Sequence, residues 1–417
     1  MARNKVRNIE RLESYVIPLI QQEGADQKVT DFWPRVLLAV LRGISLVYGV
    51  AVWLRMYFFR VGVLRRWPLG CQVISVGNVT AGGTGKTPVV EIFARELTKE
   101  NRKVAILSRG YRRKEKPFFQ RIFSGEMAPT LVVSDGRRVL LDSEIGGDEP
   151  YMLASNLPGV VVLVDRNRVK SGRYAIRKFG CDTLILDDGF QYQKLKHSHD
   201  IVLVDQTNPF GNGNLLPRGV LRESIKNLRR ADFIFITKSQ GHSEALEERI
   251  RKLNHHAEII ECCHAPKALR NVYGQEVKPL EWLAGKKVLA LSGIAVPQSF
   301  EGFLTRYGAE LTECVRYADH HRYAMQEVIN VVNRAADLGC DALITTEKDA
   351  VRFPLLATTA VPVYYLRIEI EILKGAQNFR DAVCHICFKP PREEGADEAV
   401  QSSARAAEAV ESYATVE

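Results

Sequence analysis

Residues 73–87 read V-I-S-V-G-N-V-T-A-G-G-T-G-K-T, and this stretch decides the fold. It begins with the apolar run Val73–Val76, of the kind that forms a buried parallel strand. Four glycines follow, and Lys86-Thr87 then opens a pattern typical of a helix. Glycines let backbone N–H groups close around an anion, and the helix N-terminus adds its dipole. The order of strand, glycine-rich loop and helix therefore predicts a site for the phosphates of a nucleotide.

Within this loop we expect Lys86 to reach the β- and γ-phosphates and the Thr87 hydroxyl to hold Mg²⁺. The other phosphate contacts are expected from Thr80, Ala81, Gly82, Gly83, Thr84 and Gly85. The general pattern G-x-x-x-x-G-K-[ST] has glycine at its first position, where this sequence has Thr80. An ordinary glycine-rich turn is the alternative, and the strand and helix on either side favour the phosphate loop.

The composition describes a globular protein with room for two or three domains in 417 residues. Lys and Arg number 58 against 49 Asp and Glu, a net charge of +9 that favours an anionic partner. Nucleic acid, a membrane surface and a phosphorylated substrate all fit that charge. The eight cysteines are scattered, which indicates reduced cytosolic thiols. The C-x-x-C at 384–387 lacks a second ligand pair, so core packing explains it better than a metal.

Residues 35–66 contain six arginines and no acid, interleaved with aliphatic and aromatic side chains. Arg35, Arg42 and Arg60 would share one face of a straight helix. The longest uncharged run, 43–54, is shorter than the ~20 residues that span a bilayer. The pattern predicts an amphipathic helix in the membrane interface, with arginines toward anionic head groups. Packing on its own domain is the alternative, and a spanning helix is disfavoured because it would contain Arg42.

Two acids end another predicted strand, in the run D-T-L-I-L-D-D at 182–188. An apolar strand that closes in aspartate is typical of a site where carboxylate meets Mg²⁺ or its waters. In a parallel sheet the carboxyl ends of the strands open on one crevice. We therefore expect Asp187 and Asp188 to lie opposite Lys86 and Thr87. The two motifs together are more specific than either alone.

Other polar residues are weaker candidates when each is taken alone. Asp148 and Glu149 precede a helix that Pro150 can begin, and capping of that helix is the simpler explanation. Arginines in the loop 215–223, L-L-P-R-G-V-L-R-E, are either solvated or a phosphate-binding edge. The loop D-H-H-R-Y at 319–323 is of interest because phosphoryl transfer to a hydroxyl benefits from a base.

Strand and helix patterns alternate twice along the chain, once from the phosphate loop onward and again from about residue 286. This predicts an α/β fold with two α/β lobes, the first a P-loop NTPase-like doubly wound sheet, preceded by an N-terminal amphipathic helix. The predicted domains are an N-terminal helical membrane-interface segment (1–68), a P-loop domain (69–265), a smaller C-terminal α/β domain (280–388) and a disordered acidic tail (389–417).

The ordered set of motifs resembles the tetraacyldisaccharide 4′-kinases, the lipid A 4′-kinases. The matching motifs are G-N-V-T-A-G-G-T-G-K-T (77–87), S-R-G-Y (108–111), G-D-E-P (147–150), L-D-D-G-F-Q (186–191), L-P-R-G-V-L-R-E (216–223), D-H (319–320) and T-E-K-D-A (346–350). The likeness runs from about residue 35 to about residue 370 and includes the threonine at position 80.

The resemblance implies a P-loop kinase that uses ATP and Mg²⁺ to phosphorylate the 4′-hydroxyl of lipid A disaccharide 1-phosphate, giving lipid IVA in lipopolysaccharide biosynthesis. It also implies a peripheral, monotopic protein at the cytoplasmic face of a bacterial inner membrane. The implied partners are this lipid and an anionic membrane surface, with no nucleic acid. The basic, aromatic stretch at 35–66 supports the membrane partner independently.

The resemblance also assigns site residues by their positions in the motifs. Asp148 is similar to the catalytic carboxylate that accepts the proton of the hydroxyl, and His320 to the histidine paired with it. The acids expected around the metal, with Thr87, are Glu149, Asp187 and Asp188. The arginines suited to the 1-phosphate of the substrate or the transferring phosphoryl group are Arg109, Arg166 and Arg222.

Two other functions fit a phosphate loop. One is a P-loop enzyme with another target, such as a soluble sugar or nucleoside kinase or a nucleic-acid-dependent ATPase. It leaves residues 35–66 with little use, and no helicase-like second set of motifs occurs. The other is a nucleotide-binding switch or membrane scaffold, which predicts nucleotide binding without any phosphorylated product.

Overall fold

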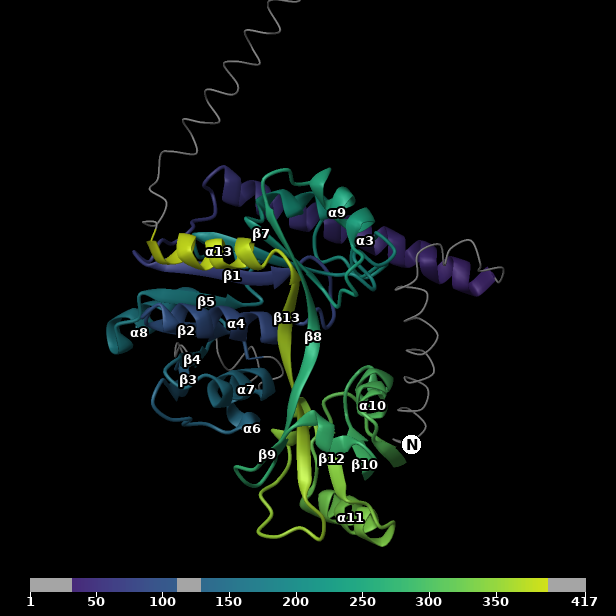
Figure 1. Cartoon of the computed structure of the whole chain (residues 1–417). Helices are drawn as coiled ribbons and strands as arrows, with labels where there is room; N and C mark the ends of the chain where they lie inside the picture. The colour runs from purple at the N-terminus through teal and green to yellow at the C-terminus, as the bar shows by residue number, and fades with distance from the viewer. Residues whose placement is uncertain (1–31, 111–128, 389–417) are drawn as a thin grey trace, which may run out of the picture.

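The structure is a computed structural model that describes residues 32–110 and 129–388 (Figure 1). The predicted acidic tail, the part of the N-terminal segment before Phe32, and Tyr111 of the S-R-G-Y motif lie outside the described residues. The other motifs all fall within them.

Strands and helices alternate along most of this chain. The strands are β1 Gln72–Asn78, β2 Val104–Ser108, β3 Leu131–Asp135, β4 Val161–Val164, β5 Thr183–Asp187, β6 His199–Asp205, β7 Phe233–Thr237, β8 Glu258–Asn271, β9 Val277–Lys278, β10 Lys287–Ser292, β11 Glu310–Arg316, β12 Ala342–Thr346 and β13 Val363–Lys374. The helices are α3 Phe32–Arg60, α4 Lys86–Lys99, α6 Ser143–Gly146, α7 Asp148–Asn156, α8 Arg168–Phe179, α9 Glu244–Arg251, α10 Pro297–Arg306, α11 Met325–Asp337, α12 Glu347–Ala350 and α13 Ala376–Phe388, with 3₁₀ turns at Ile225–Arg230 and Leu280–Leu283.

These strands form one sheet in the order β11-β10-β12-β13-β8-β7-β6-β1-β5-β2-β4-β3, and β9 pairs with β8. Neighbours are parallel except in the pairs β13–β8, β8–β9 and β3–β4. Strands β1, β2, β5, β7 and β12 are buried along their whole length, as parallel strands covered on both faces are. The prediction of an α/β fold with a mostly parallel sheet is confirmed.

The antiparallel pair of β8 and β13 joins two parts of the sheet. We call strands β1–β7 with their helices the larger part, and β10–β12 with α10, α11, α12 and the loops that follow these elements the smaller part. In Figure 1 the two long strands run from the larger part, at the top, down to the smaller part. β8 was not predicted, and it passes through residue 265, where the predicted P-loop domain ends. The division into domains 69–265 and 280–388 stays a prediction.

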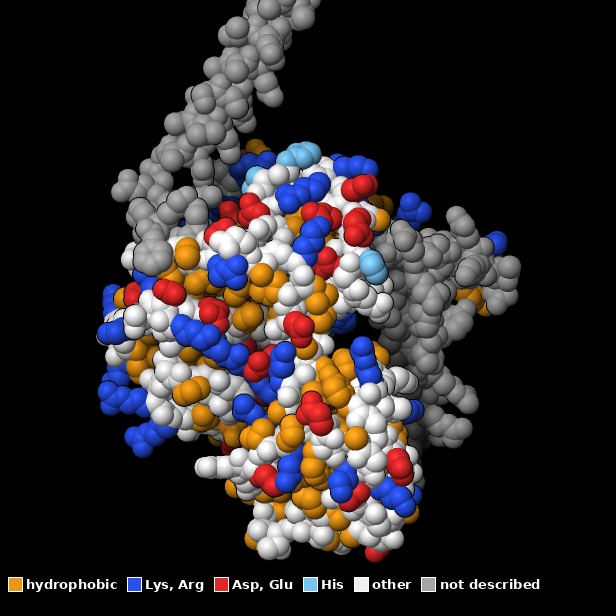
Figure 2. Space-filling model, viewed as in Figure 1, with side chains coloured by type: hydrophobic (Ala, Val, Ile, Leu, Met, Phe, Trp, Pro, Cys, Tyr) orange, Lys and Arg blue, Asp and Glu red, His pale blue; other side chains and the backbone are white. Residues whose placement is uncertain are grey.

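The apolar core follows the same arrangement. Aliphatic and aromatic side chains fill both faces of the larger part, and a separate group lies on each face of β10 and β12. The last helix, α13, returns to the larger part, where the Phe379 ring lies 5.1 Å from that of Phe93 on α4. Figure 2 shows basic and acidic side chains interspersed over the face in view, so the net positive charge forms no single basic stripe there.

The N-terminal helix α3 leaves much of its apolar surface exposed. The exposed apolar side chains are Phe32, Trp33, Val36, Val40, Ile44, Leu46, Val47, Val50, Trp53, Leu54, Tyr57 and Phe58. Within the described residues, α3 is the one helix long and apolar enough to cross a membrane by length and composition. The inner face is buried at Leu38, Ser45 and Phe59. A long apolar N-terminal helix of this kind is consistent with membrane association.

Candidate active site

The glycine-rich loop lies between β1 and α4, in the predicted order of strand, loop and helix. Gly82 and Gly85 have φ angles of 120° and 79°, a region that favours glycine. A Cβ added to Gly82 or Gly83 would meet no atom of the described residues within 4 Å, so this side of the loop is open toward them. A Cβ on Gly85 would lie 2.5 Å from Nε2 of His264, a residue of β8. The loop therefore requires glycine both for its backbone shape and for its contact with β8.

Lys86, the first residue of α4, is held close to the acidic end of β5. Its Nζ lies 3.2 Å from Oδ1 of Asn78 and 3.3 Å from Oδ1 of Asp188. Arg222 donates to both carboxylate oxygens of Asp188 at 2.8 Å. Burial opposes ionisation of Asp188, and the charges of Lys86 and Arg222 outweigh it and lower the pKa of that carboxyl. The phosphate loop, the end of β5 and the loop 215–223 thus meet at one fixed carboxylate.

The surroundings of Asp187, next to Asp188, raise the pKa of its carboxyl instead of lowering it. Its Oδ2 accepts a hydrogen bond from Ser108 at 3.2 Å, and its buried Oδ1 has no hydrogen-bond partner among the described residues. Burial, with the negative charges of Glu149 and Asp188, raises the pKa of Asp187 to about 7. An unpartnered buried carboxylate oxygen is a feature that a cation or a donor would satisfy. In residues 32–110 and 129–388, however, no three acidic, His or Cys side chains gather into a metal-binding group.

Asp148 begins α7 and faces three side chains of the smaller part. Its Oδ1 accepts from Nη2 of Arg322 at 2.7 Å, and its Oδ2 accepts from Nε of Arg352 at 2.8 Å. Nδ1 of His320 lies 3.4 Å from Oδ2. Asp148 and His320 are therefore neighbours, although 172 positions separate them in the sequence. Glu149, the next residue, pairs with Lys348 of the T-E-K-D-A motif at 3.0 Å.

The predicted arginines occupy two different settings. Arg222 contacts Asp188, whereas Arg109 and Arg166 are exposed and follow β2 and β4, two paired strands. A third arginine in this region, Arg168, was not predicted. It is buried, its guanidinium stacks 4.6 Å from the ring of Tyr192, and burial lowers its pKa.

Several other residues of the site were missed as well. Asn78 and Gln191 lie inside the matching motifs, and Gln191 donates to the Asn78 carbonyl at 2.9 Å. Arg352 follows the T-E-K-D-A motif by two positions, and Arg322 lies within D-H-H-R-Y. A polar residue at a strand end was the available signal for Asn78. Nothing in the sequence paired the two arginines with Asp148, because the contacts are tertiary.

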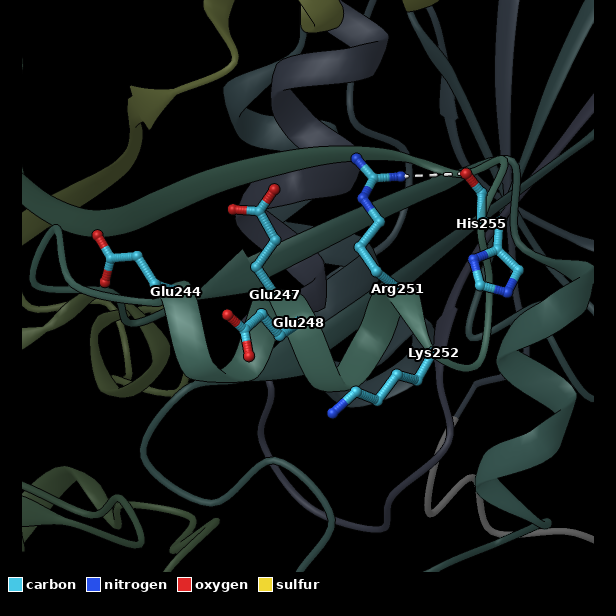
Figure 3. A pocket seen from close by; sticks show the side chains of 6 residues that line it. All are labelled: Glu244, Glu247, Glu248, Arg251, Lys252 and His255. Atoms are coloured by element: carbon cyan, nitrogen blue, oxygen red, sulfur yellow. Dashed lines mark hydrogen bonds between the residues drawn. The ribbon is translucent and has the colours of Figure 1, made fainter.

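A separate hollow of about 430 Å³ lies along α9 (Figure 3). Its lining residues are Glu244, Glu247, Glu248, Arg251, Lys252 and His255. Figure 3 shows the three glutamates along the helix and Arg251 bonded to the His255 carbonyl. This hollow shares no residue with the site around Lys86.

Helix α3 lies against the same loop that carries Arg222. The Tyr48 hydroxyl donates to the Arg222 carbonyl at 2.8 Å, and the Ser45 hydroxyl donates to the Leu215 carbonyl at 2.7 Å. Arg222 therefore links the two, since its backbone contacts α3 and its side chain contacts Asp188.

Comparisons with known proteins show one family to which this chain is similar. The family described as tetraacyldisaccharide-1-P 4′-kinase, LpxK, matches residues 37–387. A tetraacyldisaccharide 4′-kinase of Halothermothrix orenii is 37% identical over 392 residues, covering 90% of this chain and 98% of that protein. One of Syntrophus aciditrophicus is 40% identical over 354 residues, covering 82% and 91%.

A solved structure is also similar. The crystal structure of LpxK from Aquifex aeolicus in complex with ATP has a TM-score of 0.67 and 28% identity, and the match covers 84% of this chain and all of that one. The family match covers most of the chain, and a relative of about 40% identity belongs to the same family. The chain belongs to the tetraacyldisaccharide 4′-kinase family of kinases.

Proposed function

We propose that this protein transfers the γ-phosphoryl group of ATP to the 4′-hydroxyl of tetraacyldisaccharide 1-phosphate, which yields lipid IVA in lipid A biosynthesis. The observation that carries the proposal is the meeting of Lys86 with the acidic end of β5 beside α7, which begins at Asp148. A phosphate loop supplies a donor site, and a carboxylate next to it can serve a hydroxyl acceptor. The relative solved in complex with ATP supports the choice of nucleotide.

In this mechanism the phosphate loop, Thr80 to Thr87, binds the triphosphate, and Lys86 offsets charge on the β- and γ-phosphates. Asp148 accepts the proton of the sugar hydroxyl while the oxygen–phosphorus bond forms and the bond to ADP breaks. Arg222 holds Asp188 beside Lys86. Arg109 and Arg166, at neighbouring strand ends, are suited to the 1-phosphate.

Mg²⁺ fits the donor set at this place. Asp187 has a buried oxygen without a partner in the described part of the chain and a raised pKa, and a cation would relieve both conditions. Asp187, Asp188, Glu149 and the Thr87 hydroxyl would hold the ion, which would shield the charge of the phosphates. Because these acids form no metal-binding group by themselves among the described residues, the nucleotide phosphates would complete the coordination.

The proposed location is the cytoplasmic face of the inner membrane, with α3 in the interface. An exposed apolar surface on α3 lies beside the loop of Arg222. A lipid held by its acyl chains near α3 would therefore present its sugar head group toward the phosphate loop.

The roles of Lys86 and Asp148 are testable by substitution. Lys86→Ala and Asp148→Ala should each lower kcat for lipid phosphorylation by roughly 10²–10⁴-fold, since each removes a group that acts in the transition state. Thermal unfolding should show both variants folded. Glu310→Ala, on the exposed edge strand β11, is the matched control and should keep normal turnover. Near-normal turnover in either test variant would remove its proposed role.

A further inference from the structure

We propose that Arg352 is a positioning residue that bridges Asp148 and His320 and fixes the His320 imidazole in the tautomer with its proton on Nε2. The proposal rests on the role proposed above for Asp148 and on the position of His320 beside it. Arg352 lies just beyond α12 in the smaller part, and Asp148 begins α7 in the larger part. The bridge therefore joins the two parts at the proposed acceptor site.

The geometry determines which atom donates. Arg352 Nε donates to Asp148 Oδ2 at 2.8 Å, and Arg352 Nη2 lies 3.1 Å from His320 Nδ1. A guanidinium nitrogen can only donate, so Nδ1 of the imidazole must be the acceptor. A neutral Nδ1 that accepts from Arg352 cannot also donate to Asp148, from which it lies at the longer distance of 3.4 Å. The imidazole proton is then on Nε2, which lies 3.9 Å from an oxygen of Asp319.

The Arg352 side chain is seated so that it can impose this arrangement. It is fully buried, and its remaining nitrogen, Nη1, donates to Asp349 Oδ1 at 3.1 Å and to the Gly293 carbonyl at 3.4 Å. Asp349 is itself buried and accepts from the hydroxyls of Thr346 at 2.6 Å and Tyr323 at 3.0 Å. All three guanidinium nitrogens have partners, so the plane of the fork is fixed.

His320 is held by the same cluster through its backbone. Its φ angle is 63°, a left-handed conformation that is uncommon for a residue other than glycine. Its backbone N–H donates at 3.2 Å to the Gly293 carbonyl, the group that also accepts from Arg352. The strained turn thus aims the ring at Arg352, which is a typical condition at functional sites.

The bridge leaves Asp148 able to receive a substrate hydroxyl. Each carboxylate oxygen can accept two hydrogen bonds, and Arg322 and Arg352 use one on each oxygen. Arg352 thereby sets the direction of the free lone pairs, and His320 stays beside Asp148 without donating to it. A lysine at 352 would keep the charge but could not span the two acceptors as a planar fork.

Arg322 offers a matched comparison. It also bonds Asp148, and its other bonds go to Ser143 at 3.0 and 3.1 Å. Among the described residues, its guanidinium makes no hydrogen bond to His320, and the side chain is 48% exposed. Arg322→Lys therefore disturbs the guanidinium bonds to Asp148 and Ser143 without changing the partner of the imidazole.

The tautomer can be measured directly in the full-length protein. With ¹⁵N-labelled histidine, long-range ¹H–¹⁵N spectra report which ring nitrogen carries the proton, and His320→Gln identifies the His320 signals among the nine histidines. The wild type should show His320 with protonated Nε2 and unprotonated Nδ1. Arg322→Lys should preserve that pattern, and Arg352→Lys should lose it. A protonated Nδ1 in the wild type, or an unchanged pattern in Arg352→Lys, would overturn the proposal.

Kinetics separate positioning from folding. Arg352→Lys should lower kcat for lipid phosphorylation at least about tenfold, because a misaligned base costs rate, while KM for ATP stays within about twofold. An unchanged kcat would overturn the positioning role. If Arg352→Lys does not fold, the wild-type spectrum is the test, and a protonated Nδ1 of His320 would overturn the proposal. A wild-type protein inactive on the lipid would contradict the proposed function and leave the spectroscopic result standing.

Discussion

At the scale of single residues, Asp187 and Asp188 are adjacent carboxyls with opposite electrostatic surroundings. Asp188 lies between Lys86 and Arg222, whose charges outweigh its burial and lower its pKa. Within residues 32–110 and 129–388, the one hydrogen-bond partner of Asp187 is the Ser108 hydroxyl, and burial is the main cause of its raised pKa. In the folded protein the ionised form of Asp188 is therefore stabilised, whereas the ionised form of Asp187 destabilises the fold. Such an unfavourable group is typical of a site that awaits a ligand.

Asp187→Asn should consequently stabilise the protein in the absence of metal and nucleotide. The pKa of Asp187 rises from 3.8 to about 7 on folding, so between these values the folded state holds a proton that the unfolded chain has released. The free energy of unfolding of the wild type then falls as pH rises through this window. Urea unfolding with EDTA should show the variant more stable by roughly 1–3 kcal/mol at about pH 8 and by less at about pH 5.

Asp188→Asn is the matched control, with the opposite sign. The lowered pKa of Asp188 means that its ionised form stabilises the fold, so its loss should destabilise the protein at about pH 8. Equal effects of the two substitutions would show that the two carboxyls do not differ as described here.

The sequence could predict these acids but not their individual roles. A strand that ends in two aspartates places both near the phosphate loop. Which of them contacts Lys86 depends on the turn after β5, where Asp188 takes a φ of 56°. The partners of Asp148 were even harder to predict from the sequence, because Arg352 is 204 positions away.

At the scale of elements, α3 combines an exposed apolar surface with hydrogen bonds to the loop at the site. The arginine pattern predicted a helix that lies in the membrane interface, and a helix over Phe32–Arg60 is observed. Its docking on the loop 215–223 was not predictable, because it depends on small and polar residues such as Ser45 and Gly49. A helix packed on one side and apolar on the other suits a protein that binds a lipid surface.

Charges placed on the exposed side of α3 should weaken membrane binding. Val47 and Trp53 are 71% and 62% exposed, so Val47→Glu with Trp53→Glu should not disturb the core. Flotation with vesicles of anionic phospholipid should show binding at least about tenfold weaker, because apolar area no longer enters the interface. Leu355→Glu, 88% exposed in the smaller part, is the control and should float as the wild type does. Full binding by the α3 variant would contradict the anchor.

The long strand β8 could not be predicted from its sequence pattern. Strands β1 and β5 coincide with the predicted apolar runs at 73–76 and 182–188, because a strand covered on both faces shows its burial in its sequence. β8 changes along its length from buried to alternately exposed, and it contains Pro266. Its partner β13 is about a hundred positions away, so local periodicity indicated neither the strand nor the pairing.

At the scale of the whole molecule, a buried ion network joins the elements on which the site is built. Arg367 on β13 bonds Glu91 on α4 and, at 2.9 and 3.0 Å, both oxygens of Glu347 on α12. Asn156 at the end of α7 donates to the same Glu347 at 2.7 Å. The helices that begin at Lys86 and Asp148 are thus tied to the strand that joins the two parts. Burial raises the pKa of Glu91, although Arg367 opposes the rise.

Substitution of Arg367, the central cation of this network, should lower the free energy of unfolding. Arg367 is 3% exposed, so Arg367→Met leaves the buried Glu91 and the half-buried Glu347 without their shared partner, and the free energy of unfolding should fall by about 3–5 kcal/mol. Arg316→Met removes an exposed pair with Glu301 and should have little effect. Urea unfolding measures both. Equal stability of the two variants would contradict a structural role for the network.

The site as a whole combines residues of both parts, since Lys86 and Asp148 belong to the larger part and His320 to the smaller part. Relative motion of the parts about β8 and β13 would then open and assemble the acceptor side, which would also exclude water from the phosphoryl group. We propose this closure as a further part of the mechanism, because Asp148 and His320 lie on different parts.

The most direct measurement is the mass of the lipid product. Purified protein is incubated with ATP, Mg²⁺ and tetraacyldisaccharide 1-phosphate, and the lipid is analysed by mass spectrometry, with fragmentation to locate the new group. We expect a single added phosphate on the 4′-hydroxyl, formed by the wild type and lost in Lys86→Ala. An unmodified lipid, or a phosphate at another position, while the wild type hydrolyses ATP would contradict the proposed function.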